Sequence, residues 1–228
     1  MGRVEWLQKR KKGIGGSDAA AVIGQNPYMT NVELWEIKTG RKEQADISDK
    51  EAVKFGIAAE DHIRQMFILD YPKFYVKHES FKTYENIKHP FIRGSFDGEI
   101  TDGETGRSGV LEIKTGTIRR AADWEKWGGK GREYETRIPQ NYYIQILHYF
   151  LVREDFEFAI LKARLVEPDY YKRSINGNFF TEDRITIRHY LVERQNCLDD
   201  LAYLYEKEEE FWGYVERDER PPLIIQGV

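Results

Sequence analysis

The sequence predicts an α/β domain with a mixed central β-sheet and helices on both sides. Stretches with helical spacing of apolar residues are interspersed with stretches that alternate in polarity, and a turn-rich hairpin lies between them. Hydrophobic residues make up 40% of the 228 positions, enough to bury a substantial core. We expect a single domain over residues 1–228, with its core at about 6–166 and a C-terminal strand and long helix at 167–228 packed on it.

The composition limits the class of protein. The single cysteine, Cys197, excludes an internal disulfide and a metal site built from several cysteines of the chain. The net charge of −4 argues against general coating by nucleic acid but leaves room for a local basic track. The sequence shows neither an apolar run of membrane-spanning length nor a signal peptide, so we expect a cytosolic protein with no membrane partner.

The rest of the chain is organised around a predicted β-hairpin at residues 93–115. Two short alternating strands flank a turn at residues 101–106 that is rich in Asp and Gly. Alternation places Glu112 and Lys114 on one face of the second strand, and Asp97 can reach that face from the first. Two carboxylates and a lysine so placed can hold a hard divalent cation beside a bound water. The alternative is an exposed hairpin with a cross-strand ion pair.

A basic segment at residues 8–12 precedes a double glycine and a short predicted helix at 18–23. Ser17 is the expected N-cap of this helix. A helix N-terminus that follows Arg10 and several lysines suits an anion, and a solvated basic loop capped by a serine is the alternative.

Two more helices are predicted before the first strand. A Thr-x-x-Glu capping box begins one at 31–39, and helical spacing of apolar residues predicts a longer one at about 48–69. Glu60 lies beside the apolar stripe of the longer helix. It either packs against the sheet or pairs at the surface with Arg64, four residues further on.

The second half of the chain continues the alternation. Strands are predicted at 74–88, 155–165 and 168–175, a helix at 138–152, and a long amphipathic helix from residue 181 that ends in a solvated acidic run at 206–210. Residues 124–132 combine Trp, Gly and basic residues and suit either a DNA-facing arm or a disordered loop. Tyr142, Gln145 and Tyr149 share a stripe of the helix at 138–152, where the Gln amide binds a phosphate or base edge or satisfies the backbone.

Together these residues resemble the PD-(D/E)XK nuclease superfamily, and more narrowly the YqaJ-type viral recombinases, the lambda-exonuclease-like alkaline exonucleases of phages and prophages. The resemblance covers about residues 6–166. It rests on elements in a fixed order: Gly15-Gly16-Ser17-Asp18-Ala19-Ala20, Glu60, Gly94-Ser95-Phe96-Asp97, Leu111-Glu112-Ile113-Lys114, and Ile138-Pro139-Gln140-Asn141-Tyr142 with Gln145. One departure is that Phe96-Asp97-Gly98 lacks the superfamily's nominal Pro, in a position that varies widely.

The resemblance implies a restriction-endonuclease-like core and a role for each matching residue. Asp97 and Glu112, with the backbone carbonyl of Ile113, would bind one or two Mg²⁺ ions, with Mn²⁺ as a substitute. Glu60 would support the metal through bound water, and Lys114 would orient or help to deprotonate the attacking water. The 5′-terminal phosphate of DNA would be held by a further set: Arg10, Ser17, Ser95 and Gln145, with Tyr142 beside them.

The same resemblance implies a metal-dependent exonuclease. Such an enzyme digests linear double-stranded DNA from its 5′ ends to 5′-mononucleotides and leaves 3′ single strands for recombination by annealing. It implies a ring-shaped homotrimer, a single-strand annealing protein as partner, and a phage or prophage protein in the bacterial host cytoplasm. The alternatives are an endonuclease or a RecB- or Cas4-like nuclease on the same fold, and a non-catalytic DNA-end-binding module. The complete set of Asp97, Glu112 and Lys114 argues against the module, which gains nothing from carboxylates held against DNA.

Overall fold

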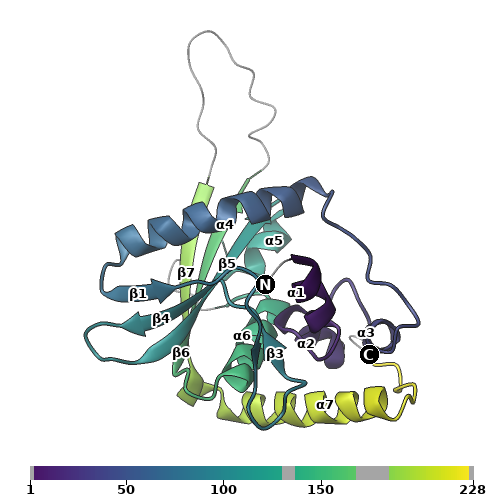
Figure 1. Cartoon of the computed structure of the whole chain (residues 1–228). Helices are drawn as coiled ribbons and strands as arrows, with labels where there is room; N and C mark the ends of the chain where they lie inside the picture. The colour runs from purple at the N-terminus through teal and green to yellow at the C-terminus, as the bar shows by residue number, and fades with distance from the viewer. Residues whose placement is uncertain (1–2, 130–136, 168–184, 226–228) are drawn as a thin grey trace.

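The computed structural model describes residues 3–129, 137–167 and 185–225 (Figure 1). A five-stranded sheet has the order β1-β4-β5-β6-β7, in which β5 and β6 are parallel and all other neighbours antiparallel. A two-stranded sheet joins β2 and β3. The predicted α/β fold with a mixed central sheet is confirmed. The strands are β1 Phe74–Lys77, β2 Tyr84–Glu85, β3 Arg93–Gly94, β4 Gly98–Asp102, β5 Ser108–Thr117, β6 Phe158–Val166 and β7 Ile185–Glu193.

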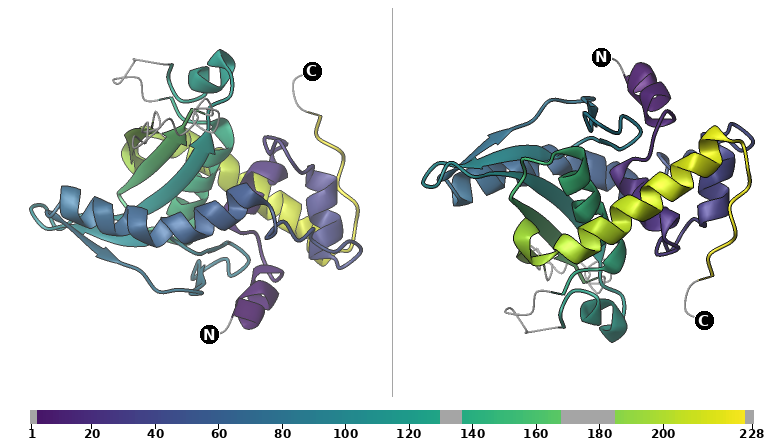
Figure 2. Two further views of the ribbon diagram at one scale, coloured as in Figure 1. Left: turned by 90° about the horizontal axis from the view of Figure 1, so that it is seen from above. Right: turned by 90° about the horizontal axis from the view of Figure 1, so that it is seen from below.

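Helices cover both faces of the five-stranded sheet (Figure 1, Figure 2). α4 packs on one face, and α6 with α2 and α7 lies on the other. Because β5 and β6 are parallel, the chain between them must cross over the sheet, and α6 makes that crossover. No helix in the described ranges is both long and apolar enough to cross a membrane. The helices are α1 Arg3–Arg10, α2 Gly16–Val22, α3 Asn31–Lys38, α4 Glu51–Asp70, α5 Ala121–Glu125, α6 Gln140–Val152, the 3₁₀ turn η2 Arg194–Asn196, and α7 Leu198–Glu216.

The predicted hairpin is confirmed, although its first strand starts later than expected. β4 pairs antiparallel with β5 from Gly98 onwards. In the turn, the Asp102 carboxylate accepts hydrogen bonds from the backbone N–H groups of Glu104 and Thr105 and so fixes the reversal. Asp97 therefore lies just before the strand, outside the β4–β5 ladder, and its side chain can turn toward β5.

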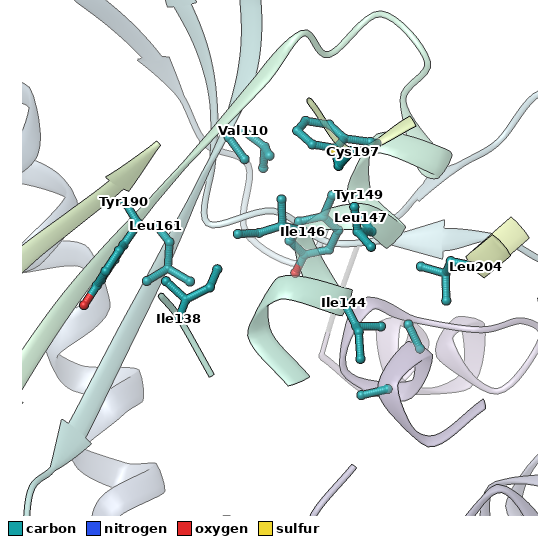
Figure 3. Packing of buried hydrophobic residues seen from close by; sticks show 14 of the residues in the cluster. Val110, Ile138, Ile144, Ile146, Leu147, Tyr149, Leu161, Tyr190, Cys197 and Leu204 are labelled. Carbon is teal, nitrogen blue, oxygen red and sulfur yellow. The ribbon is translucent and has the colours of Figure 1, made fainter. Parts of the chain in front are cut away.

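Two layers of apolar side chains hold the sheet in place. Figure 3 shows Val110 of β5 and Leu161 of β6 packed with Ile144 and Ile146 of α6. A second cluster lies under α4 and contains Leu111 and other residues of β4, β5 and β6. Neighbouring residues of β5 thus enter opposite layers, as the alternation predicts. Apolar side chains consequently cover the central part of β5 on both faces of the sheet.

The predicted helix from residue 181 is wrong at its start, because β7 occupies residues 185–193. Ile187 and Leu191 are 45% and 56% exposed on one face of β7, whereas Arg188 and Tyr190 are buried on the other. Apolar residues at these positions also fit the two-residue period of a strand, and pairing with β6 decides between the two periods. The amphipathic helix is α7, which starts only at Leu198.

The two alternatives for residues 124–132, a DNA-facing arm and a disordered loop, are wrong for the part that the structure describes. Trp124 and Trp127 are each only 6% exposed and belong to the core between the sheet and α6. The guanidinium of Arg188 donates hydrogen bonds to the backbone oxygens of Trp127 and Gly129. These tryptophans are therefore structural. The predicted strand at 168–175 lies outside the described residues.

The acidic run at 206–210 is not uniformly solvated, because Glu208 is completely buried. Its carboxylate lies 2.7 Å from Nδ1 of His148 on α6, and the other ring nitrogen of His148 lies 2.7 Å from the backbone oxygen of Arg93. Burial alone would lower the pKa of His148, but the negative charge of Glu208 and the hydrogen bonds to Glu208 and to the Arg93 oxygen together outweigh it, and the pKa is raised. This buried pair ties α7 to α6 and to β3.

Candidate active site

A cavity of about 420 Å³ lies between α1, α2, α4, α6 and β5. All but one of the predicted site residues line it, and the exception is Tyr142. The ring centroid of Tyr142 nevertheless lies only 4.8 Å from Nζ of Lys114, at the margin of the cavity. The fold therefore brings together residues that the sequence scatters over most of the chain. The lining residues predicted from the sequence are Arg10, Ser17, Glu60, Ser95, Asp97, Glu112, Ile113, Lys114 and Gln145.

The two carboxylates of the hairpin meet at one end of this cavity. Oδ2 of Asp97 accepts a hydrogen bond of 2.7 Å from the backbone N–H of Ile113, which fixes Asp97 against β5. Ile113 itself packs under α4, so its neighbour Glu112 points to the opposite face of the sheet. There Glu112 is only 2% exposed and faces α6.

Glu112 has one oxygen engaged and one free among the described residues. Oε1 lies 2.5 Å from Nζ of Lys114 and accepts a hydrogen bond of 2.8 Å from Nε2 of Gln145. Oε2 is buried in the cavity wall and accepts no hydrogen bond. A buried carboxylate oxygen without a partner is costly unless a ligand satisfies it. This free oxygen marks the place where a cation fits the residues present.

Burial, followed by repulsion between like charges, governs the electrostatics of Asp97. Burial and the neighbouring charges of Glu112 and Glu60 raise the pKa of Asp97 well above its ordinary value. Burial by itself would lower the pKa of Lys114, but the two carboxylates Glu112 and Asp97 raise it, so Lys114 stays charged. The Lys114 ammonium and the Arg64 guanidinium beside Glu60 carry two positive charges against three carboxylates, and a divalent cation would relieve the remaining repulsion.

The described residues contain no group of three or more His, Cys, Asp or Glu side chains that could hold a metal ion. A cation bound here would need to rely on fewer protein carboxylates, with water completing its coordination. Zn²⁺ in structural sites is enclosed by four protein ligands, whereas Mg²⁺ keeps several waters and binds one or two carboxylates. The pair Asp97 and Glu112, with the free Oε2 of Glu112, suits the second kind of ion.

The sequence leaves two interpretations of Glu60 open, a place beside the sheet and an ion pair with Arg64, and the structure shows features of both. It lines the cavity, and its Oε1 also lies 3.1 Å from the guanidinium of Arg64. Arg64 is only 5% exposed and donates a further hydrogen bond of 2.8 Å to the backbone oxygen of Asp97. Arg64 thus joins α4 to the segment that carries Asp97.

A group of hydrogen-bond donors lines another part of the cavity. Nη2 of Arg10 donates to Oγ of Ser17 at 2.8 Å, and the indole N–H of Trp6 donates to Oγ of Ser95 at 2.9 Å. Both serine oxygens act as acceptors in these bonds, which leaves their own hydrogens available to a ligand. The Arg10 guanidinium also lies 4.9 Å from the centroid of the Trp6 ring. Sequence reasoning misses Trp6 as a site residue, although its spacing of four residues from Arg10 places both on one helix face.

The prediction that Ser17 caps its helix is wrong. α2 begins two residues earlier than predicted, at Gly16, with Gly15 as the N-cap. Oδ2 of Asp18 accepts the backbone N–H of Gly15 at 3.0 Å and fixes this end of the helix. The Ser17 side chain is consequently not used for capping and faces Arg10 instead.

Gln145 contacts the carboxylate end of the cavity. Its Nε2 donates to Glu112 and also to the hydroxyl of Tyr149 at 2.6 Å, so both of its amide hydrogens are used. Burial, followed by the charge of Glu112, raises the pKa of Tyr149 well above its ordinary value. Tyr149 therefore stays a neutral phenol behind Gln145. The sequence places it on the same stripe but gives no reason to include it in the site.

The fold is shared with solved nucleases. The chain is similar to an alkaline exonuclease, LHK-Exo, from Laribacter hongkongensis, with 14% identity, a TM-score of 0.56, and coverage of 94% of this chain and 93% of that one. The structure of LHK-Exo in complex with dAMP is 15% identical to this chain, with a TM-score of 0.61, and the match covers 94% of this chain and 93% of that one. A phage related exonuclease from Haemophilus somnus 129PT is 15% identical, with a TM-score of 0.52, and the match covers 90% of this chain and 94% of that one. At these identities the likeness establishes the fold alone, which is consistent with the expected PD-(D/E)XK-like core.

Sequence comparisons assign the family. The chain is 31% identical over 220 residues to the Uncharacterized protein YqaJ of Bacillus subtilis (strain 168). The match covers 93% of this chain and 56% of that protein, so the chain spans little more than half the length of this relative. The sequence profile of the YqaJ-like viral recombinase domain matches residues 5–154, a range that holds every predicted site residue. The chain therefore belongs to the YqaJ-like viral recombinase domain family.

Proposed function

We propose that this protein is a Mg²⁺-dependent exonuclease that digests linear double-stranded DNA in the 5′→3′ direction and releases 5′-mononucleotides. One observation carries the proposal. A single cavity is lined both by paired carboxylates with a lysine and by the hydrogen-bond donors Arg10, Ser17 and Ser95. The first arrangement suits hydrolysis of a phosphodiester, and the second suits a terminal phosphate of the same strand.

Asp97 and Glu112 would hold the ion, together with the backbone carbonyl of Ile113, and Glu60 would act through a bound water. The fit rests on the buried Oε2 of Glu112, which has no partner in the described part of the chain. One or two Mg²⁺ ions, or Mn²⁺ in their place, would supply a nucleophilic water at neutral pH and positive charge on the scissile phosphate.

The chain's own residues would orient this chemistry. Lys114 stays protonated beside Glu112, so it is placed to steady the attacking water and the charge that develops on the phosphate. Gln145, which also donates to the hydroxyl of Tyr149, holds the Glu112 carboxylate from the side of α6, and Lys114 is the second donor to it. A carboxylate bonded to two fixed donors keeps its remaining oxygen aimed in one direction, which is the preorganisation that catalysis requires.

End recognition would come from Arg10, Ser17 and Ser95. Arg10 can bind a phosphate with the part of its guanidinium fork that Ser17 does not use, and the two serine hydroxyls can each donate once. A pocket that binds a terminal 5′-phosphate sets the distance from the strand end to the carboxylates, and cleavage then starts from ends. The likeness to structures named as exonucleases, one of them in complex with dAMP, supports this choice.

The biological setting is proposed from the family resemblance. The 3′ single strands left by digestion would serve a single-strand annealing protein in recombination of a phage or prophage. A ring-shaped homotrimer would keep the enzyme on the DNA. Neither partner is needed for the chemistry of the cavity, so the activity can be tested with the purified chain.

The deciding experiment digests linear duplex DNA, labelled at either the 5′ or the 3′ end, beside a covalently closed circle of the same sequence. Early release of a 5′-labelled mononucleotide in Mg²⁺, with an intact circle and no release in EDTA, is the expected result. Cleavage of the circle would make the protein an endonuclease on this fold. Retained binding of DNA ends with no cleavage in Mg²⁺ or Mn²⁺ would make it a binding module.

A further inference from the structure

A buried ion pair lies directly behind the donors of the cavity. Nζ of Lys38 on α3 lies 2.7 Å from Oδ2 of Asp18, and the two side chains are only 4% and 5% exposed. Nζ of Lys38 also donates a hydrogen bond of 3.1 Å to the backbone oxygen of Arg10. Neither Lys38 nor Asp18 lines the cavity.

The pair connects the two chain segments that carry the donors. Arg10 is the last residue of α1, and its carbonyl is one of those that a helix leaves without an internal partner. The Lys38 ammonium occupies that position, where a cation is also favoured by the helix dipole. Asp18 in turn holds the backbone N–H of Gly15 at the start of α2. One ammonium and one carboxylate therefore fix the end of α1 relative to the start of α2.

The energetics argue that the pair serves geometry more than stability. Removing two charges from water costs several kcal/mol per ion, and an apolar pair of similar size is often no less stable. Lys42, four residues after Lys38, forms the ordinary alternative, an exposed pair with Glu33 at 2.9 Å. Burial would raise the pKa of Asp18, but the charges of Lys38 and Arg10, with the hydrogen bonds from Lys38 and Gly15, lower it and keep the carboxylate ionised. The buried pair of Lys38 and Asp18 lies between the end of α1 and the start of α2, next to the segments that carry Arg10 and Ser17.

We propose that Lys38, paired with Asp18, is a positioning residue that sets the preference of the enzyme for 5′-phosphorylated ends, because it fixes the distance between Arg10 and Ser17. This inference rests on the proposed function, since it takes the ligand of these two residues to be a terminal phosphate. Lys38 does not touch the ligand. It acts through the Arg10 backbone and, by way of Asp18, through the turn that precedes Ser17.

The test compares kcat/KM on matched duplexes that carry either a 5′-phosphate or a 5′-hydroxyl. In Lys38→Met the ratio of the two values should fall roughly 10- to 100-fold, the usual cost of misplacing a binding group by about 1 Å. The loss should appear in KM for the phosphorylated end, with kcat at saturating DNA and Mg²⁺ kept within about threefold. Lys42→Met, which breaks the exposed pair, is the matched control and should leave the ratio unchanged.

A second variant separates positioning from folding. Lys38→Met leaves the Asp18 charge buried without a partner, which by itself destabilises the protein. The double variant Asp18→Asn with Lys38→Met removes that charge and should regain thermal stability. Because Arg10 still lacks its backbone anchor, the preference for 5′-phosphate should stay low in the double variant.

The outcomes distinguish this inference from the proposed function. If the wild-type enzyme digests DNA with equal kcat/KM on 5′-phosphorylated and 5′-hydroxyl ends, both the proposed terminal-phosphate pocket and the proposed role of Lys38 are refuted. If the wild type discriminates and Lys38→Met keeps the same ratio, only the role of Lys38 is refuted. Recovery of both stability and the ratio in the double variant would reduce the pair to a structural contact.

Discussion

The buried pair of His148 and Glu208 should give the protein a measurable pH dependence of stability. Glu208→Gln keeps the size of the side chain and an acceptor for Nδ1 of His148 but removes the negative charge. Both residues are fully buried, and both ring nitrogens of His148 face oxygen atoms, at 2.7 Å each. An imidazolium ring donates to both oxygens, and the Glu208 carboxylate compensates its charge. Breaking such a pair costs about 3–5 kcal/mol.

The sign of the pH dependence follows from the raised pKa of His148 in the folded protein. The stabilisation is fully present below the unfolded-state pKa of about 6.5 and is lost as the pH rises through the folded-state pKa. In Glu208→Gln the attraction is gone and burial dominates, so the folded-state pKa of His148 falls below that of the unfolded chain. Stability of the variant should then decrease as the pH falls below about 6.5. The difference between the two proteins should be largest under mildly acidic conditions and shrink at alkaline pH.

Urea unfolding followed by circular dichroism at a series of pH values measures this difference. At about pH 6 the variant should lose about 3–5 kcal/mol, which for a domain of this size lowers the melting temperature by roughly 6–20 °C. Glu209→Gln changes an exposed neighbour on the same helix and should leave both the stability and its pH slope unchanged. Equal pH slopes for the wild type and Glu208→Gln would refute the assignment of a charged pair.

Three further predictions concern the cavity. Glu112→Ala should lower the cleavage rate to background. The melting temperature should stay within a few degrees of wild type, because the substitution also relieves the repulsion on Asp97. Full activity of this variant would exclude Glu112 as a metal ligand. Arg10→Ala should lower kcat/KM on 5′-phosphorylated ends by roughly 100-fold and on 5′-hydroxyl ends far less, and an equal loss on both would make Arg10 a general DNA contact. Arg64→Met should raise the Mg²⁺ concentration for half-maximal rate by roughly 10- to 100-fold, as loss of a residue that orients ligands does, and an unchanged Mg²⁺ titration would show that Arg64 is only structural.

The sequence predicts the hairpin of the site well because each part of it obeys a local rule. The Asp- and Gly-rich turn fixes the reversal, and the two-residue period decides which side chains share a face. The amino-acid pattern alone therefore assigns Glu112 and Lys114 to one face of β5. The start of β4 is harder to predict, since a strand begins where pairing begins, and pairing depends on a second segment.

The errors have a common physical cause, namely tertiary partners that a local pattern does not contain. Ile187 and Leu191 lie four residues apart, a spacing that fits one face of a helix as well as one face of a strand, and pairing with β6 selects the strand. The glycine-rich neighbours of Trp127 suggest a surface loop, yet this side chain fills the core beside Tyr190. Glu208 lies within an acidic run, and its burial depends on a histidine sixty positions earlier in the chain.

The hydrogen bonds of Glu112 determine which of its two carboxylate oxygens is open to a cation. Lys114 and Gln145 both use Oε1, so a cation can approach only Oε2 without displacing them. The lysine can therefore keep its contact with Oε1 whether or not an ion is bound. Tyr149 keeps Gln145 in the donor orientation, because a neutral phenol oxygen accepts from the same amide nitrogen. A change at Tyr149 should consequently alter the aim of Glu112 by releasing the Gln145 amide that holds this carboxylate.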